Sequence, residues 1–235
     1  MTAAAHRRLH RTWQEGACYT FLSMIHEILP VGMLQCNCSV LGDETTREAM
    51  VVDPGDDIEE IQAILAKHRL RLKCIVITHA HIDHIGGAKK LKDLTGAPLY
   101  LNEQDVELYR LMGEQAAFIG IPAPATTSVD VFLREGDQVE CGGIRASVIH
   151  TPGHTPGSVC LLVPQEKETT LIAGDTLFRE SIGRTDLWGG SYRQIMMSLK
   201  EKLLPLDEGI IVVPGHGPLT TIGHEREYNP FLQAL

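Results

Sequence analysis

Thr78-His79-Ala80-His81-Ile82-Asp83-His84-Ile85-Gly86-Gly87 follows the apolar run Cys74–Ile77, so this motif begins where a buried strand is expected to end. In an extended backbone the side chains of His79 and His81 point the same way. The chain then turns into a helix, and Asp83 and His84 project from its first turn. Nitrogen and oxygen donors so close together can face one cavity, which suits Zn²⁺ or another first-row metal.

Three further segments place a similar residue at the end of an apolar strand. His154 stands in Thr151-Pro152-Gly153-His154-Thr155-Pro156-Gly157-Ser158, and Asp175 ends the strand expected at Thr170–Ala173. His216 stands in Val213-Pro214-Gly215-His216-Gly217-Pro218. Proline and glycine restrict such loops to a few conformations, and a metal ligand needs a rigid support. The four strand ends together predict one polar site at the edge of a β-sandwich.

The rest of the chain alternates short apolar runs with turns and amphipathic stretches. The expected strands are Ile25–Leu29, Cys36–Leu41, Ala49–Val52, Cys74–Thr78, Pro98–Leu101, Val131–Leu133, Gln138–Cys141, Ile144–Ile149, Ser158–Val163, Thr170–Ala173 and Ile210–Val213. The expected helices are Asp57–His68, Gly86–Leu94, Glu103–Phe118 and Ser191–Leu204. Strands come first and then mix with helices, without regular βαβ units. This order predicts two sheets packed face to face and flanked by helices.

Composition limits the classes of partner and cellular location. The chain has 235 residues and a formal charge of −9, whereas binding to a nucleic-acid backbone needs clustered lysine and arginine. No apolar stretch reaches the roughly 20 residues of a membrane span. The six cysteines form no C-x-x-C pair, which argues against a zinc ribbon or a thioredoxin-like site. A cytoplasmic protein without nucleic-acid or membrane partners is therefore expected.

The first residues differ in composition from the remainder. Arg7, Arg8 and Arg11 precede the first acidic residue, Glu15, a bias that resembles a transit peptide. A disordered extension or a misplaced start is the alternative, because Met24 precedes the first clear strand pattern. We therefore expect an N-terminal extension over residues 1–23 and a single domain over residues 24–235.

The combined pattern His79-x-His81-x-Asp83-His84, His154, Asp175 and His216 resembles the metallo-β-lactamase superfamily from about Met24 to the C-terminus. The resemblance implies an α/β (α+β) fold, the four-layer αβ/βα sandwich with two mixed sheets flanked by helices. It also implies two divalent metal ions per chain. His79, His81 and His154 would bind the first ion, Asp83, His84 and His216 the second, and Asp175 would bridge both. Zinc is the expected metal, but iron and manganese accept the same donors.

The implied chemistry is hydrolysis by a metal-bridging hydroxide. Two cations lower the pKa of a bridging water and polarise the carbonyl that it attacks. Asp83 and Asp175 would orient the hydroxide while also acting as ligands. No motif suggests a serine, cysteine or lysine nucleophile.

Two segments resemble the glyoxalase II-like, or hydroxyacylglutathione hydrolase-like, subgroup of short bacterial type. They are Leu177–Asp186 and the stretch from Thr221 to Phe231. The resemblance implies a thioesterase that acts on a small thioester such as S-D-lactoylglutathione. Arg184 lies where such proteins place a basic residue that contacts glutathione, although a surface salt bridge would also explain it. The chain ends 19 residues after His216, without the helical domain that completes the glutathione site, so another low-molecular-weight thiol conjugate stays open.

Persulfide dioxygenases are the main alternative, because they also resemble Gly183-Arg184-Thr185-Asp186. They hold one iron with the counterparts of His79, His154 and Asp175, and they oxidise glutathione persulfide. These residues occur in both families, so ligand spacing does not separate the two activities. The C-terminal segment and the complete set for two metals favour the hydrolase. The sequence leaves the oligomeric state open.

Overall fold

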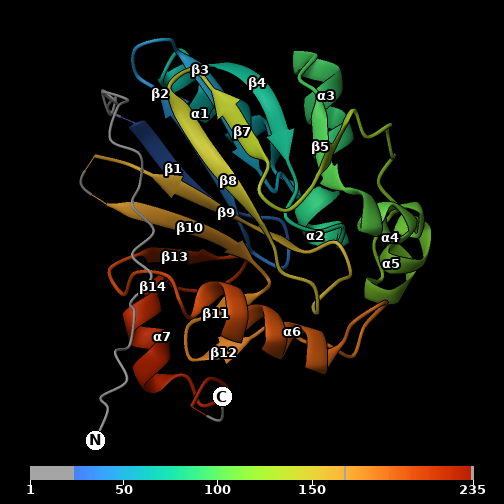
Figure 1. The fold of residues 1–235 in the computed structure, drawn as a ribbon. Coiled ribbons are helices and arrows are strands. Elements are labelled where there is room, and N and C mark those ends of the chain that lie inside the picture. The colour runs from blue at the N-terminus through green and yellow to red at the C-terminus, as the bar shows by residue number, and fades with distance from the viewer. Residues whose placement is uncertain (1–23, 167, 234–235) are drawn as a thin grey trace, which may run out of the picture.

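The computed structural model describes residues 24–166 and 168–233, which contain two six-stranded mixed sheets (Figure 1). Across the first sheet the order is β1 (Met24–Val31), β2 (Cys36–Asp43), β3 (Glu48–Val52), β4 (Arg71–Val76), β5 (Leu99–Asn102) and β6 (Val131–Leu133). Strands β1 to β3 pair antiparallel, and β3 to β6 pair parallel. The expected extension over residues 1–23 lies outside the described residues.

The second sheet brings together the C-terminal half of the chain. Its order is β14 (Thr220–Thr221), β13 (Ile211–Pro214), β10 (Thr169–Gly174), β9 (Val159–Pro164), β8 (Ile144–His150) and β7 (Gln138–Cys141). Strands β10 and β13 pair parallel, and the other neighbours pair antiparallel. A separate hairpin joins β11 (Leu177–Phe178) to β12 (Ser181–Ile182).

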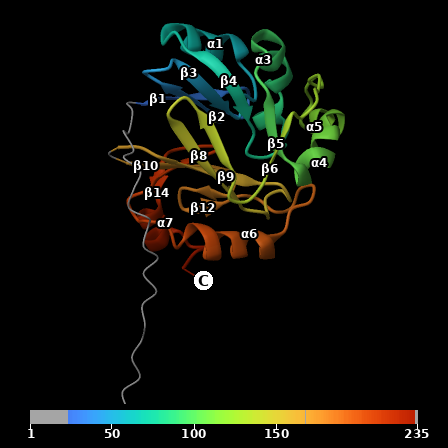
Figure 2. The same ribbon diagram turned by 45° about the horizontal axis from the view of Figure 1, so that its top comes forward.

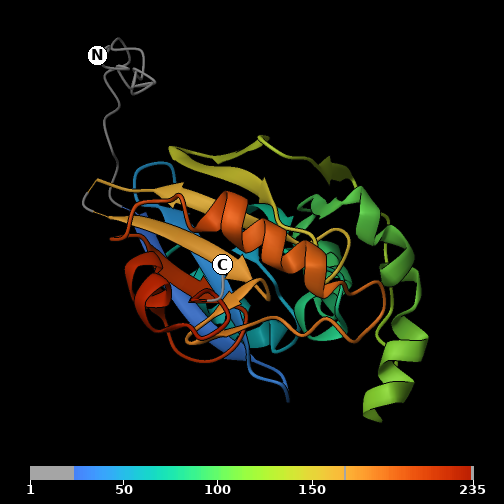
Figure 3. The ribbon, with the colours of Figure 1, turned by 60° about the horizontal axis from the view of Figure 1, so that its bottom comes forward.

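Helices cover the outer face of each sheet (Figures 2 and 3). On the first sheet these are α1 (Ile58–Lys67), α2 (Ile82–Ile85), α3 (Ala88–Thr95), α4 (Val106–Arg110) and α5 (Met112–Ile119). On the second sheet they are α6 (Tyr192–Ser198), which continues as a π-helical turn over Leu199–Leu203, and α7 (Ile222–Tyr228). The four layers confirm the fold predicted from the sequence.

Alternating side chains produce these layers, because successive residues of a strand point to opposite faces. In β3, Val51 packs among the helices, whereas Met50 and Val52 pack against the second sheet. In β4, Ile75 likewise packs among the helices and Val76 packs against the second sheet. Both faces of the first sheet are therefore buried where β3 and β4 cross the core, and the C-terminal halves of these strands are apolar, as is usual for parallel strands.

Two expected helices differ from those in the structure. The predicted helix Gly86–Leu94 is observed as α3 over Ala88–Thr95, and it is separate from α2 because the backbone N–H of Gly87 donates to the carbonyl oxygen of Pro54 at 3.0 Å instead of to α2. The predicted helix Glu103–Phe118 divides at Leu111, whose dihedral angles are φ −87° and ψ 22°. Gly113 lies two residues after Leu111, and a glycine in a helix interior reduces helix stability by about 1 kcal/mol relative to alanine.

Helix α7 was not predicted from the sequence. Its N-cap is Thr221, whose side chain accepts a hydrogen bond from the backbone N–H of His224. The carboxylate of the fully buried Glu225 then accepts from Thr220, from Asn229 and from the backbone N–H of Glu180. These bonds attach α7 to the hairpin β11–β12. Among the described residues no helix is long and apolar enough to cross a membrane.

The sandwich brings four strand ends to one edge. Strands β8, β10 and β13 run in the same direction in the second sheet, so the residues that follow them lie together. Strand β4 of the first sheet ends at the same edge, since the backbone N–H of Val159 donates to the carbonyl oxygen of Thr78 at 2.9 Å. The loops that follow these strands contain the histidines and aspartates singled out above.

One buried carboxylate connects two of these loops. Asp105 is fully buried, and it accepts from the backbone N–H of Ala80 at 2.9 Å, from the Thr155 hydroxyl at 2.8 Å and from the backbone N–H of Gly157 at 2.6 Å. Burial raises the pKa of Asp105, and the three donors oppose that rise. Gln115 holds the same loop from the other side, because it donates to the carbonyl oxygen of Ala80 and accepts from the backbone N–H of Ile82.

We expect Asp105→Asn to lower the free energy of unfolding by about 2 kcal/mol, since an amide NH₂ would face buried donors and leave them unpaired. Urea unfolding followed by circular dichroism measures the change. The control is Asp207→Asn, an exposed aspartate that accepts one backbone N–H, from Gly209. It should change stability by less than about 0.5 kcal/mol. Equal effects of the two substitutions would contradict the role of Asp105.

Candidate metal centre

Three histidine nitrogens converge in the first cluster. His154 Nε2 lies 2.9 Å from His81 Nδ1 and 3.2 Å from His79 Nε2. All three side chains are buried, with 1–6% of their surface exposed. Ligands of one tetrahedral zinc, bound at about 2.0–2.1 Å, lie roughly 3.3 Å apart, so the spacing suits a single small cation.

A second cluster lies beside it. His216 Nε2 is 3.0 Å from Asp83 Oδ2 and 3.3 Å from His84 Nε2. Asp175 stands between the clusters, because its Oδ2 lies 3.5 Å from His154 Nε2 and its Oδ1 lies 3.4 Å from His84 Nε2. One oxygen of this carboxylate therefore faces each cluster. The structure thus brings together all seven residues that the sequence analysis singled out as metal ligands: His79, His81, Asp83, His84, His154, Asp175 and His216.

The outward-facing nitrogens of four histidines are held by oxygen acceptors. His154 Nδ1 donates to the carbonyl oxygen of Arg184 at 2.8 Å, and His216 Nδ1 donates to that of Leu34 at 2.9 Å. His84 Nδ1 donates to Asp53 at 2.9 Å, and His79 Nδ1 donates to the Thr78 hydroxyl at 3.1 Å. A proton on Nδ1 leaves the lone pair of Nε2 pointing inward, as a metal ligand requires.

Asp53 helps to orient one histidine in each of the two clusters. Its Oδ2 accepts from His84 and also from the Thr78 hydroxyl, at 2.6 Å, while its Oδ1 accepts from the backbone N–H of Thr78 at 2.7 Å. Through Thr78 the same carboxylate orients His79. No pattern in the sequence indicated this role, although Asp53 directly follows a strand as the predicted ligands do.

Asn37 is another residue that the sequence analysis missed. Its side-chain amide donates to the carbonyl oxygens of Pro214 at 2.9 Å and Gly217 at 3.0 Å, and so fixes the turn that carries His216. A lone asparagine in a strand gives no local signal of this role, because its partners lie about 180 residues away. Gly215 in the same turn is sterically required, since a Cβ there would lie 2.1 Å from Asp175 Oδ1.

The electrostatics of the site favour a cation. Burial and, to a smaller extent, the neighbouring His154 lower the pKa of His81 to about 3, so the His81 ring is neutral and able to bind a metal. Burial alone would lower the pKa of His84, but Cys36, Asp175, Asp83 and Asp53 raise it above its usual value. Burial opposes ionisation of Asp175, yet His84, His154 and His216 hold its pKa below the usual range. The carboxylates around the second cluster therefore favour the binding of a cation there.

Two buried side-chain atoms show whether these residues are suited to hold a metal ion. Among the described residues, His81 Nε2 and Asp175 Oδ1 are buried and have no hydrogen-bond partner. Buried polar atoms without partners are rare in folded proteins and call for an explanation such as an ion. Asp175 Oδ1 faces the second cluster, where a cation would satisfy it. The donor set of histidine and aspartate fits zinc, iron or manganese.

Arg184 contributes to the site through its backbone. Its guanidinium points to Asp186, with nitrogen–oxygen distances of 2.7 Å and 2.9 Å, and both side chains are exposed. Its carbonyl oxygen accepts from His154. The surface salt bridge considered in the sequence analysis is therefore formed. Contact with a substrate would require the guanidinium to leave Asp186 or to bind in addition to it.

None of the cysteines in the described part of the chain is suited to act as a nucleophile. Cys36, Cys38, Cys74, Cys141 and Cys160 are all buried. Burial raises the pKa of Cys36 to about 12, although its Sγ lies 3.4 Å from His84 Nδ1. A buried thiol of high pKa holds little reactive thiolate. This agrees with the absence of a nucleophile motif in the sequence.

Comparison with known sequences agrees with this site. The family model of the metallo-beta-lactamase superfamily matches residues 31–216. An uncharacterized protein of Mycobacterium leprae is 44% identical over 217 residues, which cover 88% of this chain and 97% of that protein. Hydroxyacylglutathione hydrolase GloC of Haemophilus influenzae is 38% identical over 215 residues, covering 88% of this chain and 98% of GloC.

Solved structures show the same fold. BLEG-1, a B3 metallo-β-lactamase, is 39% identical with a TM-score of 0.81, over 88% of this chain and 99% of its own. TTHA1623 in a di-iron-bound form is 37% identical with a TM-score of 0.78, over 88% and 100%. ETHE1 from Myxococcus xanthus is 27% identical with a TM-score of 0.73, over 88% and 83%. With its family model, its relatives and its four-layer sandwich in agreement, the chain belongs to the metallo-β-lactamase superfamily.

Proposed function

We propose that this protein is a hydrolase with two divalent metal ions that cleaves small thioesters, with S-D-lactoylglutathione as the reference substrate. The supporting observation is the second cluster. Asp83, His84 and His216 are assembled as closely as the three histidines of the first cluster, and Asp175 offers one oxygen to each. A site for one metal would not need these additional ligands or the bonds from Asp53 and Leu34 that orient them.

The proposed reaction adds water to the thioester carbonyl. Two bound cations would lower the pKa of a water and polarise the carbonyl oxygen. Asp83 remains a carboxylate, because burial raises its pKa but His84 and His216 lower it by more. Asp83 and Asp175 can therefore accept hydrogen bonds from the attacking water and orient it. The carbon–sulfur bond breaks, oxygen from water joins the acyl group, and the departing thiolate takes the remaining proton. A thiolate leaves without a strong general acid.

The relatives support this class of substrate. GloC is named a hydroxyacylglutathione hydrolase, and a second relative, from Bacillus subtilis, is named a probable metallo-hydrolase at 35% identity. A thiol conjugate of low molecular weight is therefore the proposed partner. Zinc is the proposed metal, with iron as the alternative, because TTHA1623 was crystallised with two iron ions.

A persulfide dioxygenase with one iron is the second candidate. Its three ligands would be His79, His154 and Asp175. These residues do lie together, with His154 Nε2 3.2 Å from His79 Nε2 and 3.5 Å from Asp175 Oδ2. The likeness to ETHE1 also supports a relationship to that group. The complete second cluster favours the hydrolase.

Protein purified without added metal should contain about two metal ions per chain and should release free thiol from S-D-lactoylglutathione. In His84→Ala the metal content should fall to about one, and kcat should fall by at least about 100-fold, because a ligand and its support on Asp53 are lost together. Elemental analysis and a thiol-release assay measure the two quantities.

His68→Ala is the matched control, since the side chain of His68 bonds only to Glu27 in the described structure. It should retain both metals and full activity. One iron per chain, no thiol release and oxygen uptake with glutathione persulfide would establish the dioxygenase instead. Nitrocefin is assayed in parallel because of the likeness to BLEG-1, and its hydrolysis without thiol release would also contradict the thioesterase.

A role of Arg184 in binding glutathione is testable separately. If the guanidinium contacts the substrate, Arg184→Ala should raise KM for S-D-lactoylglutathione by about fivefold and leave kcat within about twofold, as expected for an exposed charge that binds substrate and transition state equally. Asp186→Ala removes the partner but keeps the guanidinium, so KM should not rise. The same KM in both variants and in the unmodified enzyme would show that the ion pair is only a surface contact.

A further inference from the structure

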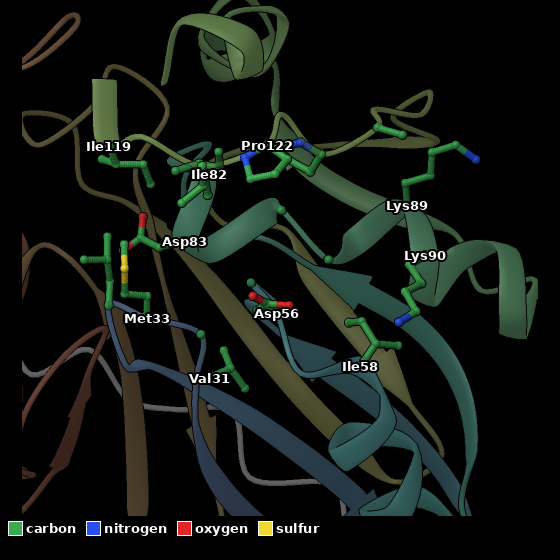
Figure 4. Close-up of a pocket in the computed structure, with 18 of the residues that line it drawn as sticks. Val31, Met33, Asp56, Ile58, Ile82, Asp83, Lys89, Lys90, Ile119 and Pro122 are labelled. Atoms are coloured by element: carbon green, nitrogen blue, oxygen red, sulfur yellow. The ribbon is translucent and has the colours of Figure 1, made fainter. Parts of the chain in front are cut away.

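An apolar cavity of about 730 Å³ borders the metal centre (Figure 4). It lies between the turn that joins β1 to β2, helices α2 and α3, and the loop that follows α5. Asp83, from the second cluster, lines one end of it. Its volume is within the range of about 300–1,000 Å³ that is usual for small-molecule sites.

The cavity walls are large apolar side chains, several of them open to water. Met33 is 69% exposed, Leu34 44% and Ile121 37%, and all three line the cavity. Ile82 and Pro122 face the same space (Figure 4). Apolar surface gathered in a concave site gains free energy when an apolar ligand covers it.

The charges around the cavity disfavour an anionic occupant. Lys89 forms a salt bridge with Asp93, and Lys90 forms one with Glu59. Asp56 also lines the cavity, and among the described residues it pairs with no lysine or arginine. The charge of Asp83 would be offset by the proposed metal ion. A negatively charged group in the cavity would therefore meet the carboxylate of Asp56, whereas both lining lysines are already paired.

A second, smaller cavity of about 430 Å³ reaches the metal centre at the next ligand. His216 lines it together with Phe178 and Arg179, and His216 Nε2 lies only 3.0 Å from Asp83 Oδ2. A thioester whose carbonyl carbon lies at these two ligands thus has the large cavity beside Asp83 and the small one beside His216. The smaller cavity carries the charged side chains of Arg179 and Glu180, and so suits the polar thiol-bearing part.

We propose that the large cavity holds the acyl group of the thioester, and that the preferred acyl group is uncharged, apolar and longer than lactoyl. This inference rests on the proposed thioesterase function and specifies its substrate class. A three-carbon lactoyl group would leave most of the apolar wall uncovered. Water adds to the same carbonyl and the same carbon–sulfur bond breaks, so only the acyl group differs.

The test compares kcat/KM for S-acetyl-, S-butanoyl-, S-hexanoyl- and S-octanoylglutathione, measured by thiol release with the metal-loaded full chain. Each fully buried methylene contributes about fourfold, so burial of only two to three of the six additional methylenes of octanoyl would already make its kcat/KM about 30-fold higher than that of acetyl. S-succinylglutathione has four acyl carbons like the butanoyl compound, but a carboxylate replaces the terminal methyl group, and it should be hydrolysed at least about tenfold less efficiently.

Two alanines in the loop after α5 provide a matched pair of variants. Ala125 lines the cavity, whereas Ala123 does not, and both are exposed. Ala125→Trp should reduce the ratio of octanoyl to acetyl kcat/KM by about tenfold, because the indole takes up part of the cavity. Ala123→Trp should leave this ratio unchanged.

The possible results separate the two proposals. Hydrolysis of all four thioesters with equal efficiency would overturn the acyl-cavity inference but leave the thioesterase standing. An equal effect of Ala123→Trp and Ala125→Trp, or efficient hydrolysis of the succinyl compound, would also overturn the inference. No thiol release from any compound, by protein that carries its metals, would overturn the proposed function and the inference together.

Discussion

The hydrogen bonds of Asp53 are the contacts on which the rest of the site depends. This carboxylate is 2% exposed, and a buried carboxylate is costly unless donors surround it. The donors present are the His84 ring and both the hydroxyl and the backbone N–H of Thr78. Because Thr78 in turn accepts from His79, a single anion sets the ring orientation of one histidine in each cluster. The two clusters are thereby held in one fixed relation to each other.

Backbone contacts between the two sheets give this network a rigid frame. The N–H of Val159 reaches the carbonyl oxygen of Thr78, and the N–H of Asn37 reaches that of Gly215 at 2.7 Å. Each bond joins a residue of the first sheet or its loops to one of the second. Asp105 adds a side-chain link between the loops that carry His81 and His154. Ligands placed on short loops between packed strands keep their geometry without help from a bound substrate, as precise metal sites require.

The proposed chemistry and the proposed substrate choice belong to different parts of this fold. The candidate metal ligands come from the strand ends of the sandwich, whereas the cavity beside Asp83 is formed by the β1–β2 turn, by α2 and α3, and by the loop after α5. Loops can change in length and composition without disturbing the packed sheets. This division agrees with the occurrence of one fold in structural neighbours as different in name as a B3 metallo-β-lactamase and ETHE1. Function must therefore be argued from the surroundings of the candidate metal centre, not from the fold alone.

Strand alternation and the His-x-His-x-Asp-His spacing are local patterns, so two packed sheets and the seven candidate ligands could be predicted from the sequence, and the family resemblance added the four-layer sandwich. The sequence did not identify Asn37, Asp105 or Gln115, whose polar partners belong to other segments and become neighbours only after folding. It predicted one helix over Glu103–Phe118, but the backbone departs from helical geometry at Leu111. The resemblance left open whether Arg184 contacts glutathione or forms a surface salt bridge; the folded chain pairs the guanidinium with Asp186 and uses the carbonyl oxygen to hold His154. Local spacing specifies which residue types are available, but only tertiary packing decides which of their atoms meet.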